Sequence, residues 1–155
     1  MALGIEWNGQ ADFKWKDVKV TNTNSTIGQI GCLLATLSNL YNLHEGKIVT
    51  SPTMLNRNLN FTKDGSVIWS SVEKEFGCKV IFDNKNPKNG DYNIARYNLL
   101  GNSHFSPILG IYNDTYAIWD VWDCKLKFLD QSKITRVTTL IFPEEGECEC
   151  CKLKL

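Results

Sequence analysis

Hydrophobic residues follow a helical spacing in the first half of the chain. An amphipathic helix is predicted over residues 32–42, because the apolar positions there fall three or four residues apart. A second, short helix is predicted with Ser51 as its N-cap and Pro52 at its first position. A third helix is predicted after residues 64–66, with Gly77 as its C-terminal stop.

Beyond the third helix the period of the apolar residues shortens, and several segments become strand-like. Asn113 and Asp114 separate two of these segments and indicate a hairpin turn. Helices therefore come first and strands second. This segregation predicts an α+β fold, with N-terminal helices packed on a mainly antiparallel sheet. The strands are expected over residues 78–82, 93–100, 105–112, 115–119, 125–129 and 135–142.

The chain of 155 residues is long enough for one compact domain, which we place at residues 1–143. Residues 1–25 are polar and are expected to be irregular. An acidic, cysteine-rich tail follows at residues 144–155. The spacing of its cysteines differs from that of structural zinc sites, even with Cys124 as a fourth ligand, so we expect a solvated tail without metal or cofactor. Those tail cysteines are Cys148, Cys150 and Cys151.

The charge balance argues against nucleic-acid binding. The chain has 17 Lys+Arg and 17 Asp+Glu, whereas phosphate neutralisation needs clustered basic residues. No segment approaches the roughly 20 apolar residues of a membrane-spanning helix. The first residues have neither the basic start nor the apolar run of a signal peptide. We therefore expect a cytoplasmic protein with reduced thiols and with neither nucleic acid nor membrane as a partner.

Cys32 is a candidate nucleophile because it stands at the start of the first predicted helix. The unpaired N–H groups and the positive end of the helix dipole favour a thiolate there. Gly31 has no Cβ, so a substrate backbone can approach the sulfur closely. The same position also suits a small apolar core residue, so the placement of Cys32 alone leaves both interpretations open. His44, at the other end of the helix, is interpreted as a C-terminal cap.

His104, one of two histidines, opens a predicted strand, so its imidazole is expected at the edge of the sheet. A cysteine nucleophile needs a base, and the base needs a third group to orient it. Asp120 and Asp123 close the next strand. A flat hairpin pairs His104 with Asp123, whereas a bulge brings Asp120 nearer. Of the neighbouring Trp119 and Trp122, we expect one to pack in the core.

Three segments together resemble papain-like cysteine peptidases of the bacteriocin-processing, double-glycine-leader type. They are the arm over residues 10–15, the turn and helix over residues 25–38, and the hairpin over residues 104–120. In that family a Gln-x-Asp-x-x-Trp arm precedes a Thr-Ile-Gly-x-x-Gly-Cys turn into the nucleophile helix. A His-Phe strand and a strand that ends in Asp then follow in the same order. The resemblance covers residues 8–122.

The resemblance implies the papain-like cysteine peptidase fold and a role for each matching residue. Cys32 corresponds to the nucleophile, His104 to the general base and then acid, and Asp120 to the group that orients the imidazole. The family also uses a glutamine as an oxyanion donor. We expect Gln10, which matches the arm motif, rather than Gln29, which is nearer to the nucleophile in sequence.

The implied function is that of a thiol hydrolase that cleaves a peptide bond or a cell-wall amide bond through a Cys-His-Asp triad. A small chain of this kind suits a bacteriophage lysis or virion-associated hydrolase, with a peptide or peptidoglycan substrate and other virion proteins as partners. A phosphate-binding Gly-Lys-Ser/Thr loop is missing from the sequence, so a transporter-linked role is not expected. The alternative is a non-catalytic virion structural or binding protein that retains the fold.

Overall fold

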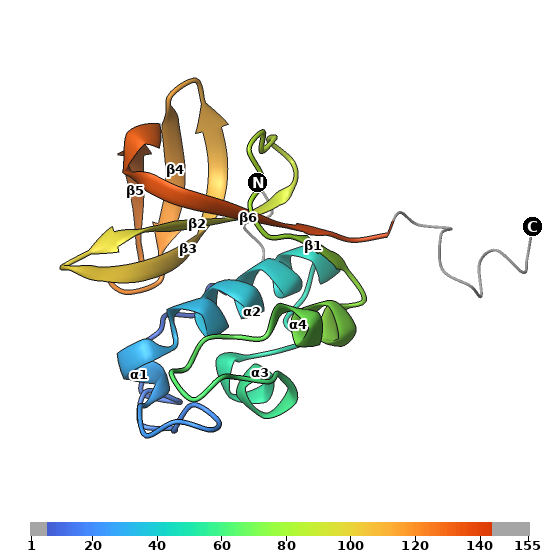
Figure 1. Cartoon of the computed structure of the whole chain (residues 1–155), viewed down its shortest axis with the longest axis vertical. Coiled ribbons are helices and arrows are strands. Elements are labelled where there is room, and N and C mark those ends of the chain that lie inside the picture. Colours follow the sequence, from blue (N-terminus) through green and yellow to red (C-terminus); the bar gives the residue numbers. More distant parts are fainter. Residues whose placement is uncertain (1–5, 144–155) are drawn as a thin grey trace, which may run out of the picture.

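The computed structural model describes residues 6–143, in which a group of helices packs against an antiparallel sheet (Figure 1). The helices precede the strands along the chain, as the sequence predicts. The helices are α1 (Ile27–Ile30), α2 (Cys32–Glu45), α3 (Pro52–Asn58) and α4 (Trp69–Phe76). The strands are β1 (Lys79–Ile81), β2 (Tyr92–Leu99), β3 (Asn102–Tyr112), β4 (Thr115–Asp120), β5 (Lys125–Asp130) and β6 (Ile134–Ile141), with a 3-10 turn η1 (Gln131–Lys133) before β6.

The predicted first helix is preceded by a separate turn of helix, α1. A capping box closes α1: the Gln29 amide donates to Thr26 Oγ1, and the Thr26 amide donates to Gln29 Oε1 over 2.9 Å. Gly31 joins α1 to α2. A Cβ at Gly31 would lie 2.5 Å from the Ile27 carbonyl oxygen, so only glycine allows α2 to begin so close to α1. This corner fixes where the first residue of α2 stands.

The other helix ends follow the predicted signals. The Met54 amide donates to Ser51 Oγ over 3.2 Å at the start of α3, and Gly77 ends α4 in the left-handed conformation at φ 63°. His44 lies in the last turn of α2 with its ring stacked on Phe142, and the two centroids are 3.8 Å apart. Its placement far along α2 keeps it away from the first turn of that helix.

The strands form one antiparallel sheet in the order β1-β6-β2-β3-β4-β5. The last strand therefore pairs with the first two, and the two ends of the strand region meet in the sheet. The β3–β4 pairing shifts register between Ile108 and Gly110, which marks a bulge in this hairpin. Such a shift changes which residues at the far end of the hairpin face one another.

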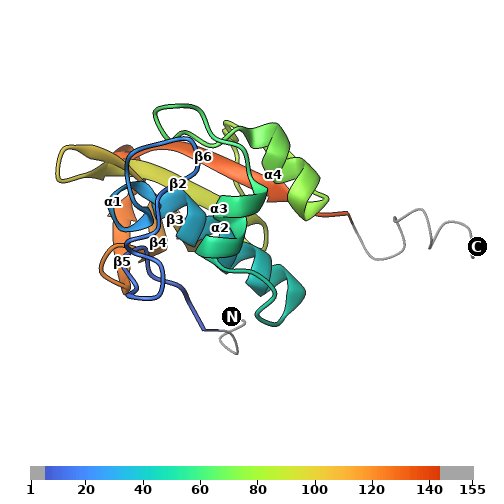
Figure 2. The same ribbon diagram turned by 90° about the horizontal axis from the view of Figure 1, so that it is seen from below.

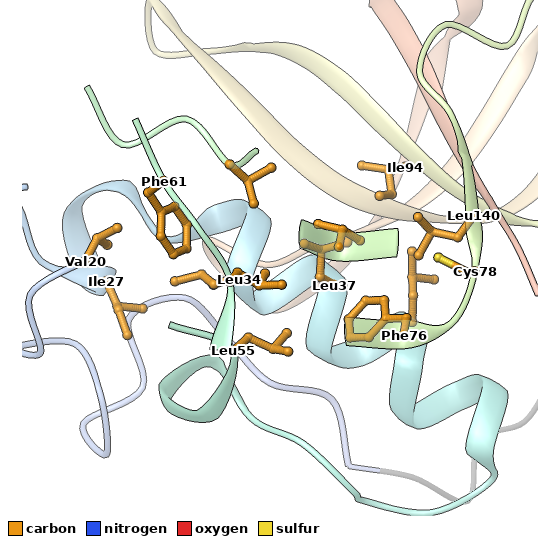
Figure 3. Close-up of a cluster of buried hydrophobic side chains, with 14 of the residues drawn as sticks. Val20, Ile27, Leu34, Leu37, Leu55, Phe61, Phe76, Cys78, Ile94 and Leu140 are labelled. Atoms are coloured by element: carbon orange, nitrogen blue, oxygen red, sulfur yellow. The ribbon is translucent and has the colours of Figure 1, made fainter. Parts of the chain in front are cut away.

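The main core lies between the helices and the sheet. Seen from below, α2 and α3 lie in front of the strands (Figure 2). Leu34 and Leu37 of α2 share one buried cluster with Ile94 of β2 and Leu140 of β6 (Figure 3). Because α2 contributes to this cluster along much of its length, its position over the sheet is fixed by apolar packing.

Three further points concern the membrane, the C-terminal tail and Cys124. No helix within residues 6–143 is long and apolar enough to cross a membrane. The predicted tail at residues 144–155, with its three cysteines, lies outside the described residues. Cys124 lies exposed in the turn between β4 and β5.

Candidate active site

Cys32 is the first residue of α2 and lines a cleft between the helices and the sheet. It is 8% exposed and packs with Ala35 and Val121. The first backbone N–H groups of a helix have no partners within the helix, and the positive end of the helix dipole lies there. Both features stabilise negative charge at the sulfur, and they offer the Cys32 N–H to an acceptor in the cleft.

A side-chain hydrogen bond joins α2 to β3 beside this cysteine. Thr36 Oγ1 donates to the Phe105 carbonyl oxygen over 3.1 Å. Thr36 follows Cys32 by about one helical turn, so both residues lie on the same face of α2. Phe105 directly follows His104 in β3. The bond therefore holds the first turn of α2 next to the segment that carries His104.

His104 is buried on an inner strand, whereas the sequence predicts its imidazole at the edge of the sheet. The difference arises because β3 is covered by β2 on one side and β4 on the other. The ring stands edge-on to that of Tyr97, its partner across the β2–β3 pair, with centroids 5.3 Å apart. The Tyr97 hydroxyl in turn shares a 2.9 Å hydrogen bond with Ser106. This packing fixes the plane of the imidazole.

Asp120, at the end of β4, holds one nitrogen of the imidazole. His104 Nε2 lies 2.9 Å from Asp120 Oδ1, and the Trp122 amide donates to the same oxygen over 2.8 Å. Asp120 is fully buried. The sequence left Asp120 and Asp123 as alternatives; the structure brings Asp120 to His104, and the β3–β4 bulge described above is the physical reason.

Lys127, on β5, is a member of the site that sequence reasoning missed. Its Nζ lies 2.7 Å from Asp120 Oδ2 and 2.8 Å from Asp123 Oδ2. Asp120 therefore has a partner on each of its two oxygens, and Asp123 is joined to the site only through the lysine. The available signal was that Lys127 lies four residues after Asp123, on the strand that pairs with the one ending in Asp120.

The environment of His104 favours its charged form. Burial alone would lower the pKa of His104, but hydrogen bonds with Asp120 and with Cys32, together with the charges of both, raise it to about 9. Nε2 is engaged by Asp120, so Nδ1 is the ring nitrogen that remains for the thiol. An imidazolium at this position stabilises the thiolate form of the neighbouring sulfur by Coulomb attraction.

The carboxylate of Asp120 is held ionised despite its burial. Burial alone would raise the pKa of Asp120, but hydrogen bonds from His104, from Lys127 and from the Trp122 amide outweigh this effect and hold the pKa well below its ordinary value. A buried carboxylate that stays ionised can accept hydrogen bonds only, so it keeps His104 Nε2 in the protonated state.

Gln10 and Gln29 both line the cleft, but their amide groups are engaged differently. Gln10 is buried, and its Nε2 donates to the Gly28 carbonyl oxygen over 3.1 Å. Its Oε1 is buried without a hydrogen-bond partner among the described residues. Gln29 is exposed and uses its side chain in the capping box of α1. The capping box uses only the Oε1 of Gln29, so each glutamine keeps an amide hydrogen to donate; the difference is that the Gln10 amide is buried and held by Gly28, whereas Gln29 is exposed.

The cleft has a volume of about 830 Å³, and its wall combines polar residues with aliphatic and aromatic ones. Trp122 is 46% exposed and lines it, whereas Trp119 is half-buried and packs against the cluster of Cys32. Trp119 is therefore the tryptophan of this pair that packs. The other apolar residues that line the cleft include Leu33, Trp69, Phe82 and Phe105.

The other described cysteines lie apart from this arrangement. Cys78 is buried, and burial together with the charge of Glu73 raises the pKa of its thiol to about 11. Cys124 is exposed as a residue, but its thiol is partly buried, and this burial together with the charge of Asp123 raises the pKa of the thiol. Among residues 6–143, no group of three His, Cys, Asp or Glu side chains is placed to hold a metal ion.

The chain has an α+β fold in which helices pack on an antiparallel sheet. Among solved structures the chain is similar to the peptidase domain of Streptococcus ComA, a bifunctional ABC transporter involved in a quorum-sensing pathway. The TM-score is 0.53 at 16% identity, with 72% of this chain and 91% of that domain covered. This likeness confirms the predicted fold class.

Comparisons based on sequence give no further relative: no family model matches the chain, and no curated protein matches it.

Proposed function

We propose that this protein is a cysteine-dependent hydrolase that cleaves a peptide or amide bond, with Cys32 as nucleophile, His104 as base and acid, and Asp120 as the orienting group. The observation that carries the proposal is the position of the imidazole. Its Nε2 is held 2.9 Å from a buried carboxylate, while Cys32 lies near enough to contribute to the raised pKa of the same ring. This arrangement supports the proposed roles, because a cysteine nucleophile needs a base nearby and the base needs a group that orients it.

The reaction proceeds in two acyl-transfer stages. The Cys32 thiolate attacks the scissile carbonyl carbon, and the imidazolium of His104 donates its proton from Nδ1 to the departing amine. The neutral imidazole then takes a proton from water, and the resulting hydroxide attacks the thioester carbon. The C–S bond breaks, the acid is released, and the thiolate–imidazolium pair is restored. Throughout, Asp120 accepts from Nε2 and keeps the ring aligned.

Gln10 and the backbone N–H of Cys32 are the proposed donors to the oxyanion. The Gln10 amide nitrogen carries two hydrogens and gives one to Gly28, so one remains for the oxygen of the tetrahedral intermediate. The Cys32 N–H belongs to the unpartnered first turn of α2. Two fixed donors at a half-enclosed cleft stabilise charge that develops only in the transition state.

Thiol labelling tests the reactive pair without knowledge of the substrate. The protein is treated with a limiting amount of iodoacetamide at pH 7, and the modified cysteines are mapped by mass spectrometry. We expect Cys32 to react faster than Cys124, although Cys124 is more exposed, and we expect His104→Ala to remove this preference. Faster labelling of Cys124 in the unmodified chain would contradict the proposal.

Two substrate assays then define the bond that is cleaved. Purified bacterial cell walls test the hydrolysis of peptidoglycan that a bacteriophage lysis or virion-associated enzyme would perform, and a peptide pool tests peptidase activity. Cys32→Ala is the matched control in both assays. If neither substrate is turned over and Cys32 is no more reactive than Cys124, the protein is a non-catalytic binding or virion structural protein.

A further inference from the structure

Two arginines stand directly opposite each other in the sheet. Arg96 of β2 and Arg136 of β6 are partners in the antiparallel register. Side chains that face each other in this way lie on the same face of the sheet, and like charges at such a pair destabilise it. The two guanidinium groups are close enough to interact, because burial and the charge of Arg96 together lower the pKa of Arg136. A pair that costs stability calls for a compensating role.

The surroundings of the pair do not neutralise it. Within residues 6–143 neither guanidinium has a carboxylate at ion-pair distance. Asp83 is near enough to act on Arg136 through its charge, but its carboxylate is bonded to Lys85 at 2.8 Å. Arg136 Nε is buried without a hydrogen-bond partner among the described residues. An unused, buried donor on a cation costs free energy until an acceptor occupies it.

Both guanidinium groups are held in place by their neighbours. Arg136 Cζ lies 3.9 Å from the centroid of the Phe82 ring, within the range of a cation–π contact. Arg96 Nη2 donates to Ser103 Oγ over 3.0 Å. The planar forks are therefore oriented before any ligand arrives, which reduces the entropy lost on binding.

The pair lines the same cleft as Cys32 and His104. Asp64 also lines this cleft, with its carboxylate engaged by Thr62 Oγ1 and by the Ser66 amide. The cleft thus has a cationic region on the sheet and an acidic residue in the loop before α4. A substrate that occupies the cleft beside the reactive pair meets both arginines.

We propose that Arg96 and Arg136 form a subsite that binds a carboxylate of the substrate. Two oxygens of a carboxylate match the paired N–H groups of a guanidinium fork, and one carboxylate between two arginines removes the repulsion of the pair. The inference rests on the proposed function and adds to it a preference for peptides that carry an acidic group at a fixed distance from the scissile bond.

A cleavage profile tests the subsite. A synthetic pool of random peptides with blocked N-termini, half ending in a carboxamide and half in a free carboxylate, is incubated with the protein. We expect the cleaved peptides to carry Asp or Glu at one fixed position, or to come from the free-carboxylate half only, which distinguishes a side chain from a chain end as the source of the carboxylate.

Charge-neutral variants identify the residues responsible. In Arg96→Gln and Arg136→Gln, cleavage of the preferred peptides should fall by about tenfold or more, chiefly through KM, with little change for matched peptides that carry Gln at that position. Arg136→Lys keeps the charge without the fork and should lie between. Lys133→Gln, at an exposed lysine outside the cleft, is the control. An acidic preference that is absent, or that survives in both Gln variants, would overturn the subsite.

A binding experiment distinguishes a wrong subsite proposal from a wrong proposal of hydrolase activity. The unmodified chain and Arg96→Gln are immobilised and exposed to the same pool, and the retained peptides are sequenced. If no peptide is cleaved, the proposed function fails, but selective retention of acidic peptides by the unmodified chain still supports the subsite. Equal retention by both chains would refute it, whether or not cleavage occurs. Thermal unfolding of each variant shows that it is folded.

Discussion

At the scale of single residues, the two glutamines of the cleft differ in burial and in hydrogen bonding. Gln10 is buried with a free amide hydrogen, whereas Gln29 caps α1. We expect Gln10→Ala to lower kcat by about 10²- to 10³-fold, since the proposed oxyanion donor is lost. Gln29→Ala should leave kcat close to that of the unmodified chain and destabilise the fold slightly. Steady-state kinetics and thermal unfolding measure both; the reverse order of effects on kcat would assign the oxyanion donor to Gln29.

The protonation of His104 predicts a pH dependence. Its pKa in the folded protein is raised from the ordinary 6.5 to about 9, so the folded state binds the proton more tightly than the unfolded chain. The associated stabilisation is complete below pH 6.5 and is lost as the pH rises through about 9. The proposed mechanism needs a protonated His104, which is lost over the same alkaline range. Activity and the free energy of unfolding should both decline there.

Removal of the sulfur tests the coupling between Cys32 and His104. The thiol raises the pKa of His104 through a hydrogen bond and through charge, so Cys32→Ala should lower that pKa below about 9. Titration of the imidazole signals by NMR measures the change, and Cys78→Ala serves as a control because Cys78 lies in the main core. An unchanged pKa for His104 in Cys32→Ala would show that the thiol is not in contact with the ring.

The sequence predicts Cys32 at the start of a helix and His104 near the start of a strand, and the structure places both beside one cleft, although His104 lies on an inner strand and not at the edge of the sheet. The residues alone could not choose between Asp120 and Asp123, since the choice depends on a bulge between Ile108 and Gly110. The family resemblance selected Asp120. Lys127 was not predicted as a site residue. A lysine on an outer strand has the sequence features of an ordinary surface residue, and only the strand pairing shows that it meets a buried carboxylate.

At the scale of elements, β4 and β5 are joined through the buried end of the site. Lys127→Met removes the partner of Asp120 Oδ2 and leaves that oxygen buried without a cation. We expect the free energy of unfolding to fall by about 1–3 kcal/mol. Asp123→Asn removes only the more exposed ion pair of the same lysine and should lower the free energy of unfolding by about 0–1 kcal/mol. Urea unfolding compares the two variants, and equal losses would mean that the bond to Asp120 adds nothing.

Element boundaries show where sequence patterns succeed and fail. Helices α3 and α4 carry side-chain or glycine signals at their ends, and they begin or end where Ser51 and Gly77 predict. Helix α1 has four residues, too few to display a helical period. Its signal was the capping box, which the analysis of apolar spacing does not detect. This missed turn matters because it sets the entry of the chain into Cys32.

At the scale of the whole molecule, strand positions were predictable but strand order was not. Each strand is marked by the residues of one short segment, whereas the pairing of β1 with β6 joins Lys79 to Ile141, far apart in sequence. No local pattern encodes such a pairing. It decides, however, which residues of different strands meet, and the opposition of Arg96 and Arg136 exists only because β6 lies beside β2.

The site also depends on both layers, because Cys32 is carried by a helix and His104 by the sheet. Leu37 of α2 is fully buried in the cluster that joins α2 to the sheet. Leu37→Ala should lower the free energy of unfolding by about 2–5 kcal/mol, through lost burial and the cavity that remains. Because the reactive pair exists only while the layers are packed, preferential labelling of Cys32 should be lost at the same urea concentration as the helical circular dichroism signal.

Leu126→Ala is the matched control, since Leu126 on β5 is 53% exposed and should change stability by less than about 0.5 kcal/mol. Loss of Cys32 reactivity well before the helical signal would mean that the helices and the sheet separate while each stays folded. In that case the packing at Leu37 would align Cys32 with His104 without stabilising the helices and the sheet themselves. Coincident transitions would instead show that one apolar interface stabilises the fold and aligns the thiol with the imidazole.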